Sequence, residues 1–385
     1  MQSQSKQTST IIQRRCAGPL ADELFIQCRP DLGCGKDIAH QAISIYQELD
    51  ALLRRENGPL SAVAAETVFF RDIKRDFEPF QSARRQFFSA GTESAPIMPA
   101  ATFIEQPPLD TEADVVVSAI AILPHGGSME RLSYSAPVSA HAFVLGKQRY
   151  LFAGNICGVP GNAFDQTYSM FSLADEMLAK ERMNFRNVVR TWIYLREMER
   201  DYREFNRARR EFFRHHNVTL LPASTGIYGS PCADNADFTL AFCAIRDPQH
   251  LKAAAMTTTT LNEACTYGSD FSRGLRVVEA NKVALYISGT ASVDEEGRTA
   301  HVDEFAPQVE RMLLNIETLL AAQHASFQNV VSAVTYLKTA ADAPAFQRVL
   351  NNRGLADLPN LLVHAAVCRP DLLCEMEAIA ALPLI

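Results

Sequence analysis

Residues 188–213, VVRTWIYLREMERDYREFNRARREFF, repeat the pattern of residues 63–88, VAAETVFFRDIKRDFEPFQSARRQFF. In both segments a hydrophobic run leads to a D-[FY]-x-x-[FY]-[QN] step and then to an arginine-rich amphipathic helix. A third and more divergent copy, VVSAVTYLKTAADAPAFQRVLNN, spans residues 330–352. Such internal repetition indicates that the chain is built from copies of one structural unit.

The segments that flank the three copies also correspond. Before each copy, apolar residues recur at three- and four-residue steps, which is typical of a helix with one buried face. These helices are predicted at residues 42–57, 168–183 and 308–323. Apolar strands are predicted before them at 24–30, 150–156 and 283–293, and a strand pair follows each copy after a proline-containing break. Each unit therefore reads β-α-β-α-β-β.

This element order predicts an α+β fold, in which each unit is one mixed sheet with two helices on one face. Because the edges of such a sheet invite pairing, three units can close into an intrachain pseudo-trimer. We expect a degenerate first unit at residues 21–126, a second unit at 127–250 and a third unit at 251–385, which carries the last strand pair as a hairpin. Residues 1–20 are polar at their start and are expected to be frayed.

The bulk composition excludes several classes of protein. With 47% hydrophobic and 21% charged residues and a formal net charge of −7, the 385-residue chain has no basic stripe for nucleic acid. No apolar run is long enough for a membrane span or a signal peptide. The nine cysteines are scattered and have no zinc spacing, which predicts reduced thiols, a cytoplasmic location and no metal site.

Four segments resemble the Rid (YjgF/YER057c/UK114) superfamily: SDFSRG (269–274), ISGTASVD (287–294), NVVSAVTYL (329–337) and EMEAIA (375–380). The resemblance implies the small α+β unit predicted above, usually assembled as a homotrimer with clefts between its subunits. We therefore expect a single-chain version of that trimer, either monomeric or assembled further into a homo-oligomer.

Typical Rid deaminases hold the substrate carboxylate with an arginine that closely follows a proline. The corresponding positions here are Ala101, Ser224 and Leu361 (or Asn360), and none is arginine. These side chains cannot replace a bidentate guanidinium, so ordinary imine deamination is doubtful.

A narrower resemblance is to the chorismatases, a Rid-like branch that cleaves chorismate to pyruvate and a hydroxybenzoate or dihydroxycyclohexadiene acid. VHAAVCRPDLLCEMEAIA (363–380) is similar to their terminal strand pair, although EMEA stands where EIEG is more usual. SGTASV with QVERMLLNIETLL is similar to their last β-α step, and RTWIYL, YREFNRARREFF and LPASTGIYG to their middle unit. The resemblance implies a hydrolase or lyase of secondary metabolism that needs no cofactor.

Glu375 is the candidate catalytic acid, and the resemblance places that role on it. Cleaving an enol ether begins with protonation of its methylene carbon, and apolar neighbours raise a glutamate pKa so that it keeps the proton. Glu377 lies two residues on, on the same strand face; it either raises the pKa of Glu375 or only accepts hydrogen bonds in the core. Cys368 is expected on the facing strand, where the resemblance implies that it selects the product, although it can equally be a small buried hydrophobe.

The substrate's two carboxylates call for cations and hydrogen-bond donors. Arg209 is the main candidate, although its helix also carries solvent-facing arginines, and Arg369 can equally be a surface turn residue. The full set of expected substrate-binding residues is Arg209, Tyr194, Ser224, Thr225, Gly226, Arg369 and Glu377.

Two other functions stay open. One is a Rid-type enamine or imine deaminase with an altered carboxylate anchor. The other is a protein that binds a small carboxylate ligand without turnover, since a fold does not fix a function.

Overall fold

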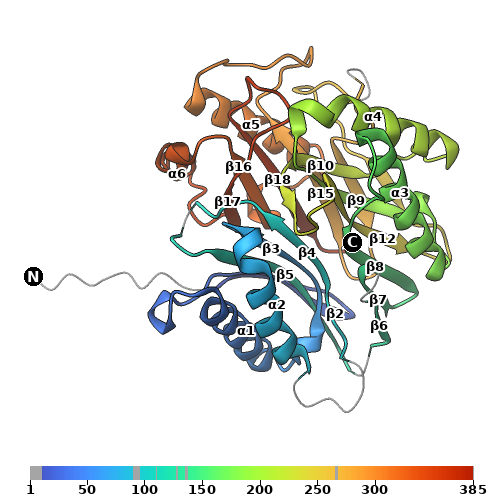
Figure 1. The fold of residues 1–385 in the computed structure, drawn as a ribbon. Helices are drawn as coiled ribbons and strands as arrows, with labels where there is room; N and C mark the ends of the chain where they lie inside the picture. Colours follow the sequence, from blue (N-terminus) through green and yellow to red (C-terminus); the bar gives the residue numbers. More distant parts are fainter. Residues whose placement is uncertain are drawn as a thin grey trace, which may run out of the picture.

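Three six-stranded sheets surround a common centre in the computed structural model, and their helices lie on the outside (Figure 1). The structure describes residues 11–89, 96–109, 111–126, 129–134, 138–264 and 268–384. Each sheet carries two α-helices on one face, so the predicted α+β fold of three repeated units is confirmed. Among the described helices, none is both long and apolar enough to cross a membrane.

The first unit has the sheet order β1-β2-β5-β3-β4-β11. Its strands are β1 (Ile11–Ala17), β2 (Ala21–Cys28), β3 (Val63–Phe70), β4 (Ala100–Glu105) and β5 (Val115–Pro124), and its helices are α1 (Ile38–Arg55) and α2 (Ile73–Ser89). The sixth strand, β11 (Ser230–Pro231), comes from the second unit and pairs with β4.

The second unit has the order β10-β9-β12-β8-β7-β6. Its strands are β6 (Arg131–Tyr134), β7 (Ser139–Leu145), β8 (Gln148–Ile156), β9 (Val188–Leu195), β10 (Ala223–Tyr228) and β12 (Phe238–Arg246), and its helices are α3 (Ala163–Lys180) and α4 (Met198–His215). Phe171 of α3, Phe212 of α4 and Phe185 pack together under the sheet, which explains the aromatic spacing of the repeat.

The third unit has the order β13-β14-β15-β18-β16-β17. Its strands are β13 (Ala253–Ala255), β14 (Gly274–Val278), β15 (Val283–Ala291), β16 (Val330–Leu337), β17 (Asn360–His364) and β18 (Cys374–Leu382), and its helices are α5 (Phe305–Ala321) and α6 (Ala343–Asn352). The central strand β18 lies between β15 and β16 and is antiparallel to both.

Two predictions about these elements are wrong. The last two strands do not form a hairpin, because β16 lies between them and pairs in parallel with β17. The expected frayed segment at residues 1–20 includes an ordered strand, because Ile11–Ala17 pairs along its length with β2; residues 1–10 lie outside the described part of the chain.

Backbone contacts close the ring at all three junctions. The edge strand β4 of the first unit pairs with β11 of the second. Ala223 of β10 forms a bridge with Ser272 of the third unit, and Pro108 of the first unit forms one with Val363 of β17. Each unit thus uses the edge strand after its second helix to contact the next unit, which leaves no such edge open.

A buried charged cluster joins the first and third units near the centre. The ammonium group of Lys282 donates to Glu23 Oε2 of the first unit and to Glu279 Oε2 of its own unit, at 2.6 Å each. The hydroxyl of Tyr286 donates to the other oxygen of Glu279 at 2.7 Å. Since all of these side chains are buried, the lysine is the counter-charge that permits two acids at this junction.

Replacing Lys282 with Met is expected to lower the free energy of unfolding by about 3–5 kcal/mol, because it leaves two buried acids without a cation. Urea unfolding at neutral pH measures this. The exposed Lys147→Met serves as the control and should change stability little. A triple variant with Lys282→Met, Glu23→Gln and Glu279→Gln should recover part of the loss; equal losses in the single and triple variants would contradict the account.

Candidate functional site

A cavity of about 860 Å³ lies between the second and third units. This volume is within the range of small-molecule sites. Its walls come from α4 and β10 on one side and from β15, β18 and the segment 268–273 on the other. The residues of interest that line it are Arg209, Ser224, Gly226, Phe271, Arg273, Gly289, Cys368, Arg369 and Glu375.

Glu375 lies on the wall of this cavity because of its place in β18. Alternate residues of a strand face opposite sides, so Cys374 and Met376 join the core of the third unit while Glu375 faces the second unit. The Glu375 side chain is 5% exposed, and this burial raises its pKa to about 8. The charge of Glu377 adds to the rise, and Arg273 and Arg190 oppose it. At neutral pH the carboxyl group therefore keeps its proton.

A glycine on the neighbouring strand makes room for this carboxyl group. A Cβ atom at Gly289 would overlap Glu375 Oε1 and would also lie 3.1 Å from the methyl group of Thr225. Only the absence of a side chain at Gly289 lets β15 pass so close to the acid.

Two buried guanidinium groups lie on the cavity wall near a single aromatic ring. Arg209 of α4 is 5.7 Å from the centre of the Phe271 ring, and Arg273 is 5.6 Å from it. Arg209 donates to Asn206 Oδ1 at 2.6 Å, while Arg273 donates to the carbonyl oxygen of Asn262 at 2.8 Å and to its Oδ1 at 3.1 Å. These fixed cations give the wall a positive charge that suits an anionic ligand.

Arg273 and Phe271 were not predicted as site residues. Both lie in SDFSRG, a segment that the sequence reasoning used only as a mark of resemblance. The sequence signal that could have identified them is an aromatic residue followed two positions later by an arginine, directly before a strand.

More arginines surround the cavity opening. Arg203, Arg207 and Arg210 are exposed on α4, and Arg210 pairs with Asp270 at 3.0 Å across the junction of the two units. Arg369 is half-buried and donates to the carbonyl oxygen of Gly297 at 2.7 Å. Arg369 thus lies on the cavity wall as predicted, held by the turn that follows β15.

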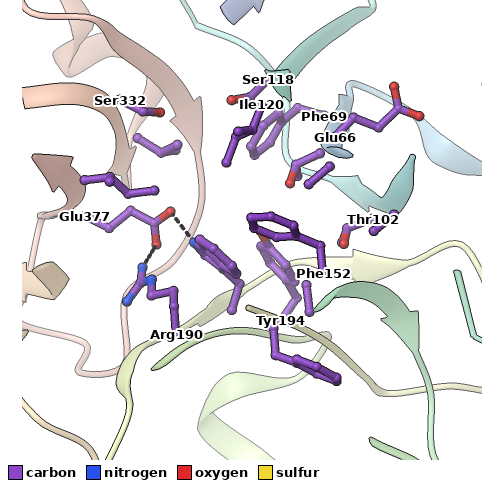
Figure 2. Close-up of a pocket in the computed structure, with 18 of the residues that line it drawn as sticks. Glu66, Phe69, Thr102, Ser118, Ile120, Phe152, Arg190, Tyr194, Ser332 and Glu377 are labelled. Carbon is purple, nitrogen blue, oxygen red and sulfur yellow. Dashed lines mark hydrogen bonds and ion pairs between the residues drawn. The ribbon is translucent and has the colours of Figure 1, made fainter. Parts of the chain in front are cut away.

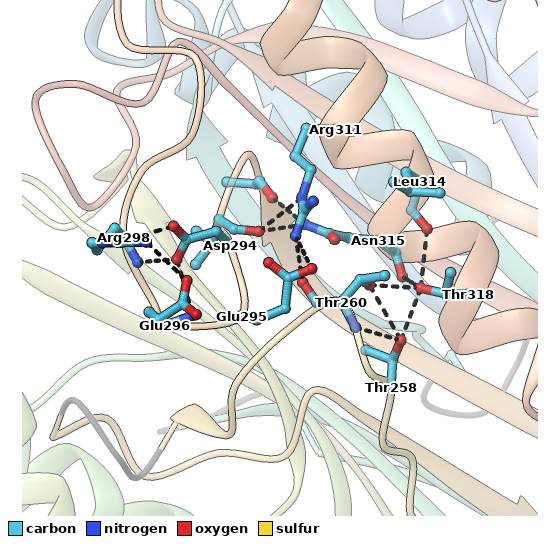
Figure 3. Close-up of polar contacts among 12 residues, drawn as sticks. Thr258, Thr260, Asp294, Glu295, Glu296, Arg298, Arg311, Leu314, Asn315 and Thr318 are labelled. Atoms are coloured by element: carbon cyan, nitrogen blue, oxygen red, sulfur yellow. Dashed lines mark hydrogen bonds and ion pairs between the residues drawn. The ribbon is translucent and has the colours of Figure 1, made fainter.

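Helix α5 holds that turn in place (Figure 3). Asn315 donates to the carbonyl oxygens of Ala291 and Val293 at 3.1 and 3.0 Å, and Arg311 donates to that of Val293 at 3.2 Å. Arg311 also pairs with Glu295 at 3.1 Å. Because Ala291 and Val293 line the cavity, this helix fixes one of its walls.

Cys368 lines the cavity, but its expected place on a strand is wrong. It lies in the loop between β17 and β18, since no hairpin forms there. The side chain is half-buried. Burial, followed by the charge of Glu375, raises its pKa to about 12, so the thiol is neutral at neutral pH.

The three β10 candidates divide between two environments. Ser224 and Gly226 line the cavity. The side chain of Thr225 points away from it, where its Oγ1 accepts from Arg190 at 2.6 Å and from the backbone N–H of Gly289 at 3.0 Å. Ser224 accepts from Thr191 at 2.8 Å, so its position is fixed by β9.

Tyr194 and Glu377 lie outside this cavity, contrary to their predicted contact with the ligand. They line a second cavity of about 80 Å³ among the three sheets (Figure 2). Glu377 Oε2 accepts from Arg190 at 2.7 Å and Oε1 accepts from Trp192 at 2.8 Å. Tyr194 is fully enclosed, and burial raises the pKa of its hydroxyl. Its strand β9, which lies between β10 and β12, places it in the hydrophobic core.

The other two junctions have no acid at the position of Glu375. Glu375 pairs in register with Tyr336 of β16. Tyr194 and Phe69 are the counterparts of Tyr336 in the other two units, and the residues that pair with them are Thr239 and Val116. The position of Arg209 is Arg84 in the first unit, where the guanidinium pairs with Glu66 instead of facing a cavity.

No group of three or more His, Cys, Asp or Glu side chains is placed to hold a metal ion in the described part of the chain. Of the predicted site residues, six line this one cavity and three do not: Glu375, Cys368, Arg209, Arg369, Ser224 and Gly226 line it, and Tyr194, Thr225 and Glu377 lie outside it.

The raised pKa of Glu375 predicts how stability changes with pH. Its carboxyl ionises near pH 4.5 in an unfolded chain and at about 8 in the folded protein. The folded state therefore binds more protons between these values, and its stability falls as pH rises through this window. The slope contributed by this group approaches about 1.4 kcal/mol per pH unit.

Urea unfolding of the protein and of Glu375→Gln between about pH 5 and 8 measures this slope. The difference in unfolding free energy between wild type and variant should shift steadily against the wild type as pH rises. Parallel pH curves for the two proteins would contradict the account.

Comparison with known proteins agrees with this geometry. The family model described as "Endoribonuclease L-PSP" matches residues 141–235 and 269–382. A 3-hydroxybenzoate synthase of Streptomyces hygroscopicus is 26% identical over 253 residues, which covers 60% of this chain and 73% of that protein. A 3-aminoacrylate deaminase, RutC, of Acinetobacter baylyi is 28% identical over 97 residues, which covers 25% of this chain and 77% of that protein.

Among solved structures, a chorismatase crystal structure superposes with a TM-score of 0.62 and 19% identity, covering 83% of this chain and 93% of that chain. It shares the fold of three units in one chain. The chain described here therefore belongs to the endoribonuclease L-PSP family, which is the expected Rid superfamily, and has the fold of a chorismatase.

Proposed function

We propose that this protein is a chorismatase-like enzyme that cleaves the enol-pyruvyl ether of chorismate, or of a closely related enol-ether acid, to pyruvate and a cyclic acid. The observation that carries the proposal is a buried acid, Glu375, on the wall of a cavity that is otherwise rich in arginine. Burial raises the pKa of this acid to about 8. The similarity to a 3-hydroxybenzoate synthase supports the same substrate class. We place the reaction in the cytoplasm and in secondary metabolism.

Glu375 is proposed to start the reaction as a general acid. It gives its proton to the methylene carbon of the enol ether, which leaves an oxocarbenium-like carbon. Addition of water to that carbon gives a hemiketal, which breaks down to pyruvate and a dihydroxycyclohexadiene acid. If a ring hydroxyl of the substrate adds to that carbon instead, a cyclic ketal forms. Loss of a ring proton and cleavage of the ring C–O bond of that hydroxyl then make the ring aromatic, and the remaining hemiketal breaks down to pyruvate and a hydroxybenzoate without net consumption of water. A neutral carboxylic acid and water suffice for both routes, and no cofactor is required.

The arginines are proposed to bind the two carboxylates of the substrate. Arg209 and Arg273 approach the ring of Phe271 from different units, so one ligand that contacts both would span the junction. Arg369 also lines this cavity. Fixed guanidinium groups suit planar carboxylates because they can donate two parallel hydrogen bonds.

Cys368 is proposed to favour the hydroxybenzoate product. Its neutral thiol lies on the wall that also holds Glu375, and the relative named 3-hydroxybenzoate synthase supports this outcome. A small, weakly polar side chain at this point takes up space next to the reacting carbon without offering water a strong hydrogen bond.

A second candidate is the hydrolysis of an imine or enamine, which the similarity to a 3-aminoacrylate deaminase favours. Against it, the position where such enzymes are expected to carry an arginine is Ser224, which is already bonded to Thr191. The two activities are distinguished by their products, since a deaminase would release ammonia from an imine or enamine and would release no pyruvate from chorismate, which contains no nitrogen. Binding of chorismate without turnover would indicate the non-enzymatic alternative.

Incubation with chorismate is expected to release pyruvate, measured with lactate dehydrogenase and NADH. Glu375→Gln should lower kcat by at least about 100-fold, since general-acid catalysis contributes about 10²–10⁴-fold. The rate should also fall above about pH 8, where Glu375 loses its proton. Glu66→Gln, which removes a buried acid from the first unit, is the control and should retain activity per folded molecule. Pyruvate release by Glu375→Gln at the wild-type rate would refute the proposal.

Arg209→Met and Arg273→Met should each raise KM for chorismate by about 10- to 100-fold, because a hydrogen bond to a charged group is worth about 1.5–3 kcal/mol. Arg214→Met, on the exposed face of the same helix as Arg209, is the matched control and should leave KM unchanged. Steady-state kinetics with pyruvate detection give the values. If only kcat changes in the two cavity variants, these arginines do not bind the ground-state substrate.

A further inference from the structure

One buried ion pair crosses from the second unit to the third directly beside the proposed catalytic acid. Arg190 of β9 is 1% exposed, and Glu377 of β18 is 6% exposed. The guanidinium donates to Glu377 Oε2 at 2.7 Å, and Figure 2 shows the two side chains pointing toward one another from different sheets. Glu377 is two residues from Glu375 on the same strand face, at a spacing of about 7 Å along the strand.

Both oxygens of Glu377 have strong donors. Oε1 accepts from the indole N–H of Trp192 at 2.8 Å, and the guanidinium of Arg190 also lies 4.9 Å from the centre of that indole ring. A buried carboxylate with a paired cation and two donors is stabilised as the anion. Glu375 has no such ion pair and accommodates its burial by keeping a proton.

The pair occurs at only one of the three junctions among the described strands. The register counterparts of Arg190 are Ala65 in β3 and Ser332 in β16. The counterparts of Glu377, read from the same pairings, are Ser118 and Ala241. This ion pair therefore lies at the junction that also carries Glu375.

Arg190 also contacts the cavity wall. The same nitrogen, Nη2, donates to Thr225 Oγ1 at 2.6 Å, and that oxygen accepts the backbone N–H of Gly289 at 3.0 Å. Gly289 is the residue whose missing side chain leaves room for Glu375. The guanidinium of Arg190 thus fixes Glu377 and also β15, the strand that passes next to Glu375.

We infer that Arg190 is a positioning residue. Its ion pair holds Glu377 as the charged member of the two neighbouring acids, so that Glu375 is the member that carries a proton. This inference rests on the proposed function, in which Glu375 must be protonated. Glu377 then acts through its charge, and neither Arg190 nor Glu377 contacts the substrate. The anionic Glu377 in turn disfavours ionisation of Glu375, which holds the proton where it is used.

Other charged or titratable groups also act on the two acids. Arg273 acts on Glu375 through its charge, and the charge of Glu375 acts on the thiols of Cys368 and Cys374. Tyr194 and Tyr336 are buried near Glu377 and stay neutral, because burial raises the pKa of both hydroxyls. Of these groups only Arg273 is a cation, and its charge, like the direct effect of the Arg190 charge, opposes the protonation of Glu375. The proposed role of Arg190 is therefore exerted through its ion pair with Glu377.

The test is a titration that needs no substrate. Protein labelled with ¹³C at the glutamate carboxyl carbons is followed by NMR from about pH 5 to 9, and Glu375 is assigned by its absence in Glu375→Gln. Wild type should show the Glu375 signal with a midpoint near 8. In Glu377→Gln the Glu375 midpoint should fall by about one pH unit or more, since a like charge has been removed.

Arg190→Met should add one carboxyl signal to those that titrate in this range in wild type, because Glu377 has lost its cation. The double variant Arg190→Met/Glu377→Gln, which removes both charges, should fold more stably than Arg190→Met and should lose that additional signal. Arg84→Met is the matched control, since it breaks the buried pair with Glu66 in the first unit and should leave the Glu375 midpoint unchanged.

Three results would distinguish the positioning role of Arg190 from a purely structural role and from a failure of the proposed function. A Glu375 midpoint that is unchanged in both Glu377→Gln and Arg190→Met would overturn the inference and leave only a structural role for the pair. The same set of titrating carboxyl signals in Arg190→Met as in wild type would also overturn it, because the ion pair would then not govern the charge of Glu377. The predicted titration without pyruvate release from chorismate would support the proton assignment and overturn the proposed function.

Discussion

Each sheet in this protein has one face covered by its own two helices and one face that only another unit can cover. This constraint decides where polar groups can stand. On β18, residues of one parity pack under α5, and residues of the other parity, which include Glu375 and Glu377, meet the neighbouring unit. Acids on that face are therefore withdrawn from water by the closure of the ring and not by the third unit alone.

Closure of the ring produces three junctions between units of the same fold, but the residues at the three junctions differ. One junction keeps a large cavity with a neutral acid and several cations. At the junction of the first and second units the corresponding arginine, Arg84, is bound to Glu66. At the junction of the third and first units, Gln27 donates to the carbonyl oxygens of Ala333 and Pro359 at 3.2 and 3.0 Å and so ties the two units together. Because the three units are parts of one polypeptide, each junction can carry residues of its own.

The sequence allowed the fold to be predicted because the repeat is strong and local. The resemblance of EMEAIA pointed to Glu375 and the arginine-rich helix pointed to Arg209, and both residues line the same cavity. Strand order was beyond such reasoning: β17 and β18 are adjacent in sequence, yet β16 lies between them, and the loop position of Cys368 follows from that. Arg190 was missed because it sits in an apolar strand, and its partner Glu377 is 187 residues away.

The asymmetry of the junctions also sets the stoichiometry of the molecule. A homotrimer of separate subunits repeats each pocket three times, so any ligand meets three equal sites that can influence one another. Here the Glu375 cavity exists once per 42.6 kDa chain. One polypeptide of three units therefore offers one such cavity, where a homotrimer of single units offers three.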